Sequence, residues 1–139
     1  HISVTEGIER SIFGTPGSLE AAIGNYTVGI RSNGRFSSTR ELVDAHCAGD
    51  AEATVIWEKS LRILARAITS FINILDPELV IIGGGITKAG PVLFQPLAAY
   101  LDEIEWRPAD RRVGILPATL GEWAGAYGAA CNAQIPLST

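Results

Sequence analysis

The chain has 139 residues, of which 47% are hydrophobic and 19% charged, values that fit one globular domain and argue against disorder. The net charge is −4 and the eleven basic residues are scattered apart from Arg111 and Arg112, which gives no reason to expect nucleic-acid binding. No apolar run reaches the ~18 residues that would span a bilayer and no charged-then-apolar leader opens the chain, so we expect a soluble cytoplasmic protein without a membrane segment.

The chain begins with His1 rather than Met, and residues 1–4 read as a strand already in progress, so the sequence looks like a piece of a longer protein. A remnant of an expression tag is the alternative for His1. The two cysteines, Cys47 and Cys131, lie far apart without C-x-x-C spacing. This spacing predicts neither a zinc ribbon nor a disulfide framework, and we expect two reduced, largely buried thiols.

Short elements are predicted for the first third of the chain. Five glycines between residues 14 and 34 disfavour a long helix there, although Ser18 is a suitable N-cap for a short helix over residues 19–23. The run from Ser38 to Glu41 matches a capping box, a hydroxyl followed three residues later by a carboxylate. A helix over residues 39–47 is therefore predicted.

The strongest periodic signal covers residues 51–75. Large apolar residues recur there at spacings of three and four, which predicts one long helix with a buried stripe. Pro77 disfavours helical geometry at Asp76 and should end the element. The stripe consists of Trp57, Leu61, Leu64, Ile68, Phe71 and Leu75.

The remaining elements alternate between strand and helix. Residues 79–82 form an all-apolar run, typical of a strand covered on both faces, and three glycines follow it. A helix should begin near Pro91, with Pro96 bending or restarting it, and a second apolar strand covers residues 113–116. A helix of small residues over 121–132 closes the chain. This order predicts an α/β fold with a largely parallel sheet.

The three glycines at residues 83–85 are a candidate ligand site. They follow a buried strand at its carboxyl end, where open α/β sheets bind ligands, and without Cβ atoms their backbone can be approached closely. A glycine turn in this place is more often only a turn. It also differs from the G-x-x-x-x-G-K-[ST] phosphate loop.

The surrounding sequence resembles the ROK family (repressor, open reading frame, kinase). Residues 76–85, Asp-Pro-Glu-Leu-Val-Ile-Ile-Gly-Gly-Gly, are similar to its adenosine-contact segment. Residues 1–4 look like the end of its E-x-G-H motif, residues 14–20 resemble the later part of its C-x-C-G-x-x-G-C-x-E motif, and the helix from Gly121 resembles its closing helix. The resemblance covers nearly the whole chain.

This resemblance implies an α/β fold of the actin-like ATPase (ribonuclease H-like) type. Residues 1–139 would then be part of the C-terminal, large domain of a sugar kinase, with a closing helix at about 121–132. The implied reaction is ATP-dependent phosphorylation of a hexose or amino-sugar hydroxyl, with Mg²⁺ as cofactor and a homodimer as the full-length form.

The resemblance also implies roles for individual residues. Gly83, Gly84 and Gly85 would contact the adenosine of ATP, and Glu20 would contact the sugar with His1 beside it. Without the motif, Glu20 would read as a solvated glutamate in the first turn of a helix. The family's catalytic aspartate and its phosphate-binding turns would lie ahead of His1, so no catalytic residue is assigned and the fragment alone should be inactive.

The chain departs from the family at its zinc site. In family members three cysteines and the motif histidine hold a structural zinc, and Ser11, Phe13 and Ser18 stand here in place of the cysteines. One histidine and two hydroxyls cannot supply the roughly four good ligands that such a zinc needs. We therefore expect no structural zinc, with Phe13 turned inward as a small hydrophobic plug.

Two alternatives to the kinase stay open at this stage. The same domain could be the sugar-sensing part of a ROK-type transcriptional repressor, or a non-catalytic sugar-binding homologue. The sugar itself could be glucose, fructose, a mannose derivative or an N-acetylated hexosamine.

Overall fold

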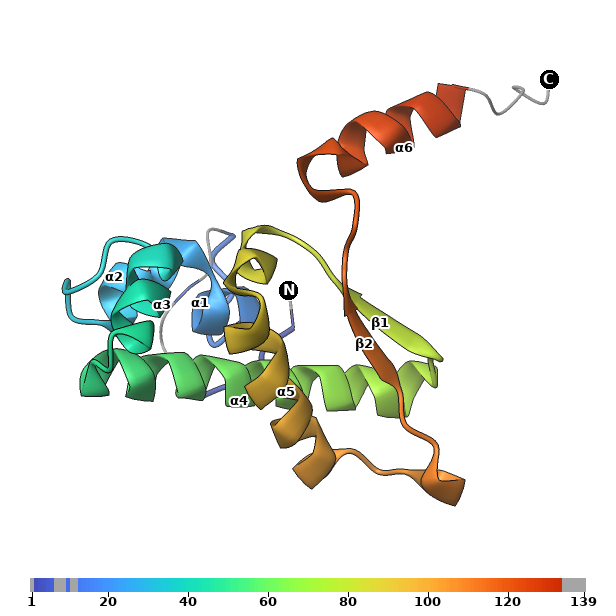
Figure 1. The fold of residues 1–139 in the computed structure, drawn as a ribbon, viewed down its shortest axis with the longest axis horizontal. Helices are drawn as coiled ribbons and strands as arrows, with labels where there is room; N and C mark the ends of the chain where they lie inside the picture. Colours follow the sequence, from blue (N-terminus) through green and yellow to red (C-terminus); the bar gives the residue numbers. More distant parts are fainter. Residues whose placement is uncertain (1, 7–9, 11–12, 134–139) are drawn as a thin grey trace.

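A long central helix organises the molecule. The structure, a computed structural model, describes residues 2–6, 10 and 13–133. The central helix α4 (Ala51–Leu75) is covered over its first half by α1 (Leu19–Ile23), α2 (Val28–Arg31) and α3 (Thr39–Cys47), and α5 (Pro91–Ile104) crosses it (Figure 1). Short 3-10 turns connect these elements at Asn25–Thr27, Gly85–Ala89, Pro108–Asp110 and Gly121–Trp123.

Local capping signals set the helix boundaries, as predicted for the N-caps of α1 and α3. The Ser18 hydroxyl caps α1 by accepting a hydrogen bond from the Ala21 N–H at 3.1 Å. Asp50 caps α4 in the same way, accepting from the Ala53 N–H at 2.9 Å. At its other end α4 stops at Asp76, whose backbone is left-handed with φ of 45°. The predicted bounds of α1, α3 and α4 are confirmed.

The capping box at the start of α3 forms in a modified way. The Ser38 hydroxyl accepts from the Glu41 N–H at 3.2 Å, as expected. The Glu41 carboxylate accepts from the N–H and the hydroxyl of Ser37, at 2.7 and 2.8 Å. These hydrogen bonds to its charged form hold the pKa of Glu41 below its usual value.

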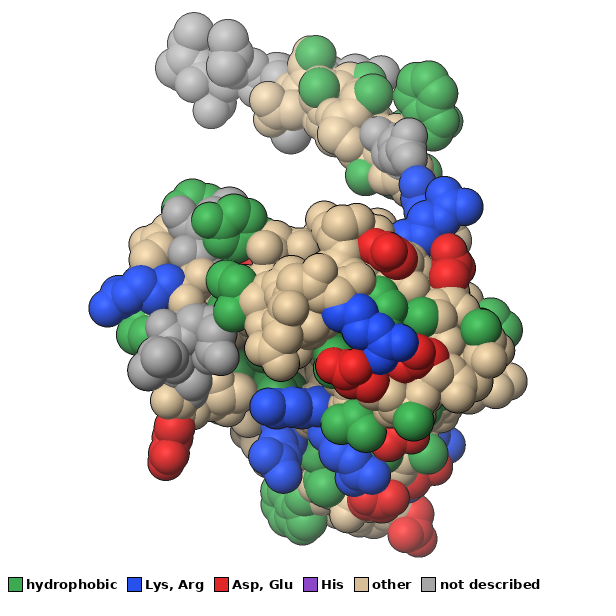
Figure 2. All heavy atoms as spheres, turned by 90° about the vertical axis from the view of Figure 1, so that its left-hand side faces the viewer, with side chains coloured by type: hydrophobic (Ala, Val, Ile, Leu, Met, Phe, Trp, Pro, Cys, Tyr) green, Lys and Arg blue, Asp and Glu red, His purple; other side chains and the backbone are tan. Residues whose placement is uncertain are grey.

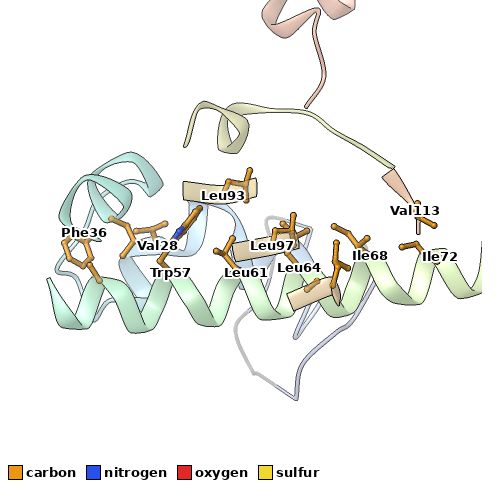
Figure 3. Close-up of a cluster of buried hydrophobic side chains, with 14 residues drawn as sticks. Val28, Phe36, Trp57, Leu61, Leu64, Ile68, Ile72, Leu93, Leu97 and Val113 are labelled. Carbon is orange, nitrogen blue, oxygen red and sulfur yellow. The ribbon is translucent and has the colours of Figure 1, made fainter. Parts of the chain in front are cut away.

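The core lies between α4, α5 and the short helices. Trp57 is 1% exposed and donates from its indole nitrogen to the Val92 carbonyl at 3.3 Å, which joins α4 to α5. Leucines spaced four apart on α5 pack onto α4, and Pro96 lies inside α5 without interrupting it. Figure 3 shows the cluster, which includes Val28, Phe36, Trp57, Leu61, Leu64, Ile68, Ile72, Leu93, Leu97 and Val113.

The stripe predicted for α4 is correct from Trp57 as far as Ile68 and wrong beyond it. Phe71 and Leu75 are 40% and 68% exposed, whereas Ile72 is buried. The reason is that the covering elements meet the end of α4 on the side of Ile72, which lies beside Val113 (Figure 3).

Two strands form a small parallel sheet. Strand β1 (Leu79–Ile82) pairs with β2 (Gly114–Pro117), with Leu79 opposite Gly114. The parallel pairing is as predicted, and β2 begins one residue later than expected. The expected burial on both faces is wrong here, because Leu79 and Ile81 are 42% and 62% exposed. Only Val80 and Ile82, which alternate with them, pack against the core.

The last helix, α6 (Ala124–Ala133), extends away from the rest of the molecule (Figure 1) and none of its described side chains is buried. Cys131 lies on it, and Cys47 ends α3; both thiols are free and exposed, so the prediction of buried cysteines is wrong. Within the part of the chain that the structure describes, no helix is long and apolar enough to cross a membrane. Acidic and basic side chains are interspersed on the face shown in Figure 2.

Backbone hydrogen bonds order the segment before α1. Ser3 and Ser18 form an isolated antiparallel bridge rather than a strand, and the Val4 N–H donates to the Gly17 carbonyl at 2.8 Å. Phe13 is 67% exposed, so the predicted inward plug is wrong: main-chain pairing holds this loop, and the ring is not needed to fill it. His1 and Ser11 lie outside the described residues.

Candidate functional site

The glycine turn after β1 has an open backbone. Gly84 has φ of 89° and ψ of 178°, a conformation essentially restricted to glycine. The Thr87 hydroxyl donates to the Gly84 carbonyl at 2.8 Å and fixes the turn. A Cβ atom added at Gly84 or Gly85 would meet no described atom within 4 Å. Space for a ligand therefore exists directly beside the backbone.

A pocket of about 780 Å³ lies against this turn. Its other walls come from α3 and from the junction between α1 and the 3-10 turn Asn25–Thr27. The Asn25 side-chain oxygen accepts from the Thr39 N–H at 2.8 Å and ties that junction to α3. Three segments distant in the sequence thus enclose one pocket, which is lined by residues 23–25, 39, 40, 43, 44, 83–86, 88 and 89.

The pocket combines apolar walls with polar groups at its rim. Ile23, Val43 and Ile86 supply apolar surface. Arg40 lies 3.8 Å from Asp44, but their side chains are 91% and 73% exposed. An ion pair so exposed contributes little stability, and both side chains remain accessible to a ligand. A flat aromatic ring with polar edges suits this lining.

Glu20 lies on α1, close to the pocket but outside its lining. The side chain is partly buried, and among the described residues its Oε2 atom is buried with no hydrogen-bond partner. Buried carboxylate oxygens are normally paired, and this one has free capacity to accept a hydrogen bond. Its Cγ lies 3.4 Å from the position of a Cβ on Gly24, which lines the pocket.

The structure places the predicted site residues in two adjacent places. Gly83, Gly84 and Gly85 line the pocket, and Glu20 lies one helical turn before the pocket residue Gly24. His1, which was predicted to lie beside Glu20, is outside the described residues. The wall formed by α3 was not predicted, because the apolar periodicity of a helix indicates its buried face without indicating which distant loop it faces.

The chain has an α/β fold of the actin-like ATPase type. Over 95% of the chain it superposes on a ROK hexokinase from Thermus thermophilus with a TM-score of 0.74 and 26% identity. The sequence model of the ROK family matches residues 8–135. The chain belongs to the ROK family.

A glucokinase from Thermotoga maritima is 37% identical over 94 residues, which are 68% of this chain and 30% of the relative. Two further solved structures share the fold at 22% identity and a TM-score of 0.66. One is a ROK family glucokinase from Streptomyces griseus in complex with glucose and AMPPNP, with 86% of this chain and 45% of that one covered. The other is a ROK family transcriptional regulator, a homologue of the E. coli MLC protein, with 84% and 33% covered. This chain spans 45% of the Thermus hexokinase, so it is less than half as long as that relative.

Proposed function

We propose that the chain is the C-terminal part of an ATP-dependent sugar kinase. Residues 1–139 belong to the large domain, and the adenosine moiety lies in the pocket against Gly83, Gly84 and Gly85. The observation that carries the proposal is the position of this pocket at the carboxyl end of β1, with the unpartnered Glu20 oxygen one helical turn from its wall. The glucokinase relative at 37% identity supports the kinase activity.

Each part of this chain would have a limited role in the reaction. ATP, bound with Mg²⁺, supplies the phosphoryl group. The open glycine turn admits the adenosine, and Glu20, with His1 beside it, accepts hydrogen bonds from sugar hydroxyls and orients the sugar. No proton transfer is assigned to this chain, because the base that removes the hydroxyl proton is expected ahead of His1. The substrate is a hexose or amino sugar, and the full-length protein is a cytoplasmic homodimer.

A sugar-sensing domain of a transcriptional regulator is the second candidate, because a ROK regulator shares the fold. Nucleotide binding separates the two. A kinase must bind ADP or ATP, whereas a sensor needs only the sugar. The glycine turn offers the sharpest test of nucleotide binding, since Cβ positions at Gly84 and Gly85 face open space.

Gly85→Val in the full-length protein should weaken ADP binding at least tenfold, about 1.4 kcal/mol, because the side chain would occupy ligand space. Gly85 lacks a positive φ, so the substitution avoids the backbone strain that Gly84→Val would introduce at φ of 89°. Calorimetric titration gives the affinity, and the melting temperature should stay within about 2 °C of the unmodified protein.

The matched control is Gly125→Val, the same substitution in α6 and away from the pocket, where a Cβ also meets nothing within 4 Å. It should leave the affinity for ADP unchanged. Unaltered ADP binding by folded Gly85→Val would rule out this turn as the adenosine site. Failure of the unmodified protein to bind ADP at all, with sugar binding intact, would favour the regulator.

A further inference from the structure

Helix α1 belongs to both halves of the proposed site. Glu20 lies in its first turn, whereas Ile23 and the C-cap Gly24 line the pocket. The Gly24 N–H donates to the Glu20 carbonyl at 2.6 Å, so the two ends are joined directly. A helix of five residues has almost no stability by itself, and its position must be fixed by contacts with the rest of the fold.

Arg31 supplies such contacts at the carboxyl end of α1. The Arg31 Nη2 atom donates to the Gly24 carbonyl at 3.0 Å, and its Nε donates to the Thr27 hydroxyl at 3.3 Å. That hydroxyl in turn donates to the Ala21 carbonyl at 2.6 Å. Carbonyl groups at a helix end have no partner within the helix, and here a single arginine reaches them directly and through Thr27.

The same arginine is anchored to the central helix. Its Nη1 donates to the Ser60 hydroxyl at 2.7 Å, and Ser60, 3% exposed on α4, donates to the Ile56 carbonyl at 2.8 Å. One side chain therefore connects the end of α1 to the central helix α4.

Within the described part of the chain, Arg31 holds this position through neutral acceptors. Among the described residues no carboxylate forms an ion pair with it, and its three acceptors are neutral. Burial lowers the pKa of the guanidinium, although an arginine stays charged at all physiological pH values. Partly burying a charge without an opposite charge carries a cost that a neutral cross-link would avoid.

We propose that Arg31 is a positioning residue that couples the sugar site at Glu20 to the nucleotide pocket by holding α1 as one rigid unit. The inference rests on the proposed function. With the anchor in place, a sugar that fixes Glu20 also fixes residues 23 and 24, so part of the ordering needed for nucleotide binding is already complete. Without the anchor, Glu20 can bind sugar while the far end of α1 stays loose, and the two sites respond independently.

The test measures the coupling itself in the full-length protein. ADP is titrated with and without a saturating sugar, taken as whichever of glucose, fructose and N-acetylmannosamine raises the melting temperature most. In the unmodified protein the sugar should tighten ADP binding at least fivefold. Arg31→Met should reduce this factor below twofold. Arg31→Lys keeps one charged donor group in place of the three donating nitrogens, so its factor should lie between those of Arg31→Met and the unmodified protein.

Arg107→Met is the matched control. Arg107 also donates to its neighbours through two nitrogens, to Glu105 at 2.9 Å and Asp102 at 2.5 Å, but these residues lie at the end of α5 and line neither part of the site. This variant should lower the melting temperature and retain the full coupling factor. Equal loss of coupling in Arg107→Met would show that general destabilisation is the cause, and would overturn the proposal.

Two further outcomes separate this inference from the proposed function. Arg31→Met with unchanged coupling, or an unmodified protein that binds ADP and sugar independently, would overturn the role of Arg31 and leave the kinase assignment standing. An unmodified protein that binds neither ligand would overturn both.

Discussion

A carboxylate oxygen buried without a partner is the most informative single atom in the structure. Oε2 of Glu20 meets no described donor, whereas two other carboxylates near the short helices have partners. Glu41 accepts from Ser37, and Asp50 accepts from the Ala53 N–H and pairs with Arg35. Desolvating an acceptor without replacing its hydrogen bond costs about 1–3 kcal/mol, so this atom suits a ligand that supplies hydroxyl donors.

Glu20→Gln in the full-length protein should therefore raise the Michaelis constant for sugar about tenfold and leave that for ATP nearly unchanged. The amide keeps the shape but removes the charge, and a hydrogen bond to a charged group is roughly twice as strong as a neutral one. Steady-state kinetics with each substrate varied in turn give both constants. Glu58→Gln, an exposed change on α4, serves as the control, and equal sugar constants for the two variants would contradict the assignment.

Elements set by neighbouring residues were predictable from the sequence. The predicted N-caps Ser18 and Ser38 fix two helix starts, and Pro91 begins α5 in the structure as expected. These signals act within one turn, so nothing distant in the chain can override them easily.

Properties that depend on what covers an element were not predictable. Apolar periodicity identified the buried stripe of α4 but not the point at which its cover ends, so Phe71 and Leu75 were misassigned. The same limit applies to the site. The glycine turn is visible in the sequence, whereas the opposite wall with Arg40 and Asp44 and the anchor at Arg31 arise from tertiary packing.

Main-chain hydrogen bonds join the two ends of the loop before α1. Two backbone N–H groups, those of Val4 and Thr5, donate to the Gly17 carbonyl at 2.8 and 3.2 Å. Gly17 has φ of 59°, and a Cβ there would lie 2.0 Å from the Thr5 carbonyl oxygen. Among the described residues no three His, Cys, Asp or Glu side chains are grouped to hold a metal ion. Main-chain pairing and a required glycine hold this loop.

Purified protein should accordingly contain no stoichiometric zinc, and a chelator should leave its melting temperature unchanged. Gly17→Ala should lower the melting temperature by several degrees, because about 1 kcal/mol of backbone strain adds to the clash with Thr5. Phe13→Ala, at a side chain 67% exposed, is the control and should change it by less than about 2 °C. One equivalent of tightly bound zinc in metal analysis would contradict this account of the loop.

At the scale of the whole molecule, this chain supplies the walls of the pocket but no assigned catalytic residue. All three walls of the pocket come from this chain, and so does the core that supports them. The chain nevertheless spans only 45% of the solved hexokinase, its helix α6 has no buried described side chain, and Ile81 on the outer face of the sheet is 62% exposed. Under the proposed function, this portion binds the nucleotide and the catalytic base lies elsewhere in the protein.

The 139 residues alone should bind ADP and catalyse no sugar phosphorylation. Removal of a proton from the sugar hydroxyl requires a base within hydrogen-bond reach, and that aspartate is expected ahead of His1. Losing general-base catalysis typically costs about 10²- to 10⁴-fold in rate, and losing the upstream phosphate-binding turns as well should bring turnover below detection. Calorimetry gives the ADP affinity, and a coupled ADP-release assay with sugar compares this chain with the full-length protein. The full-length protein with its catalytic aspartate changed to asparagine is the matched control, since it should bind both ligands and turn over about 10²- to 10⁴-fold more slowly than the unmodified protein. Sugar-dependent ADP release by the 139 residues alone would place the base within this chain and contradict the prediction.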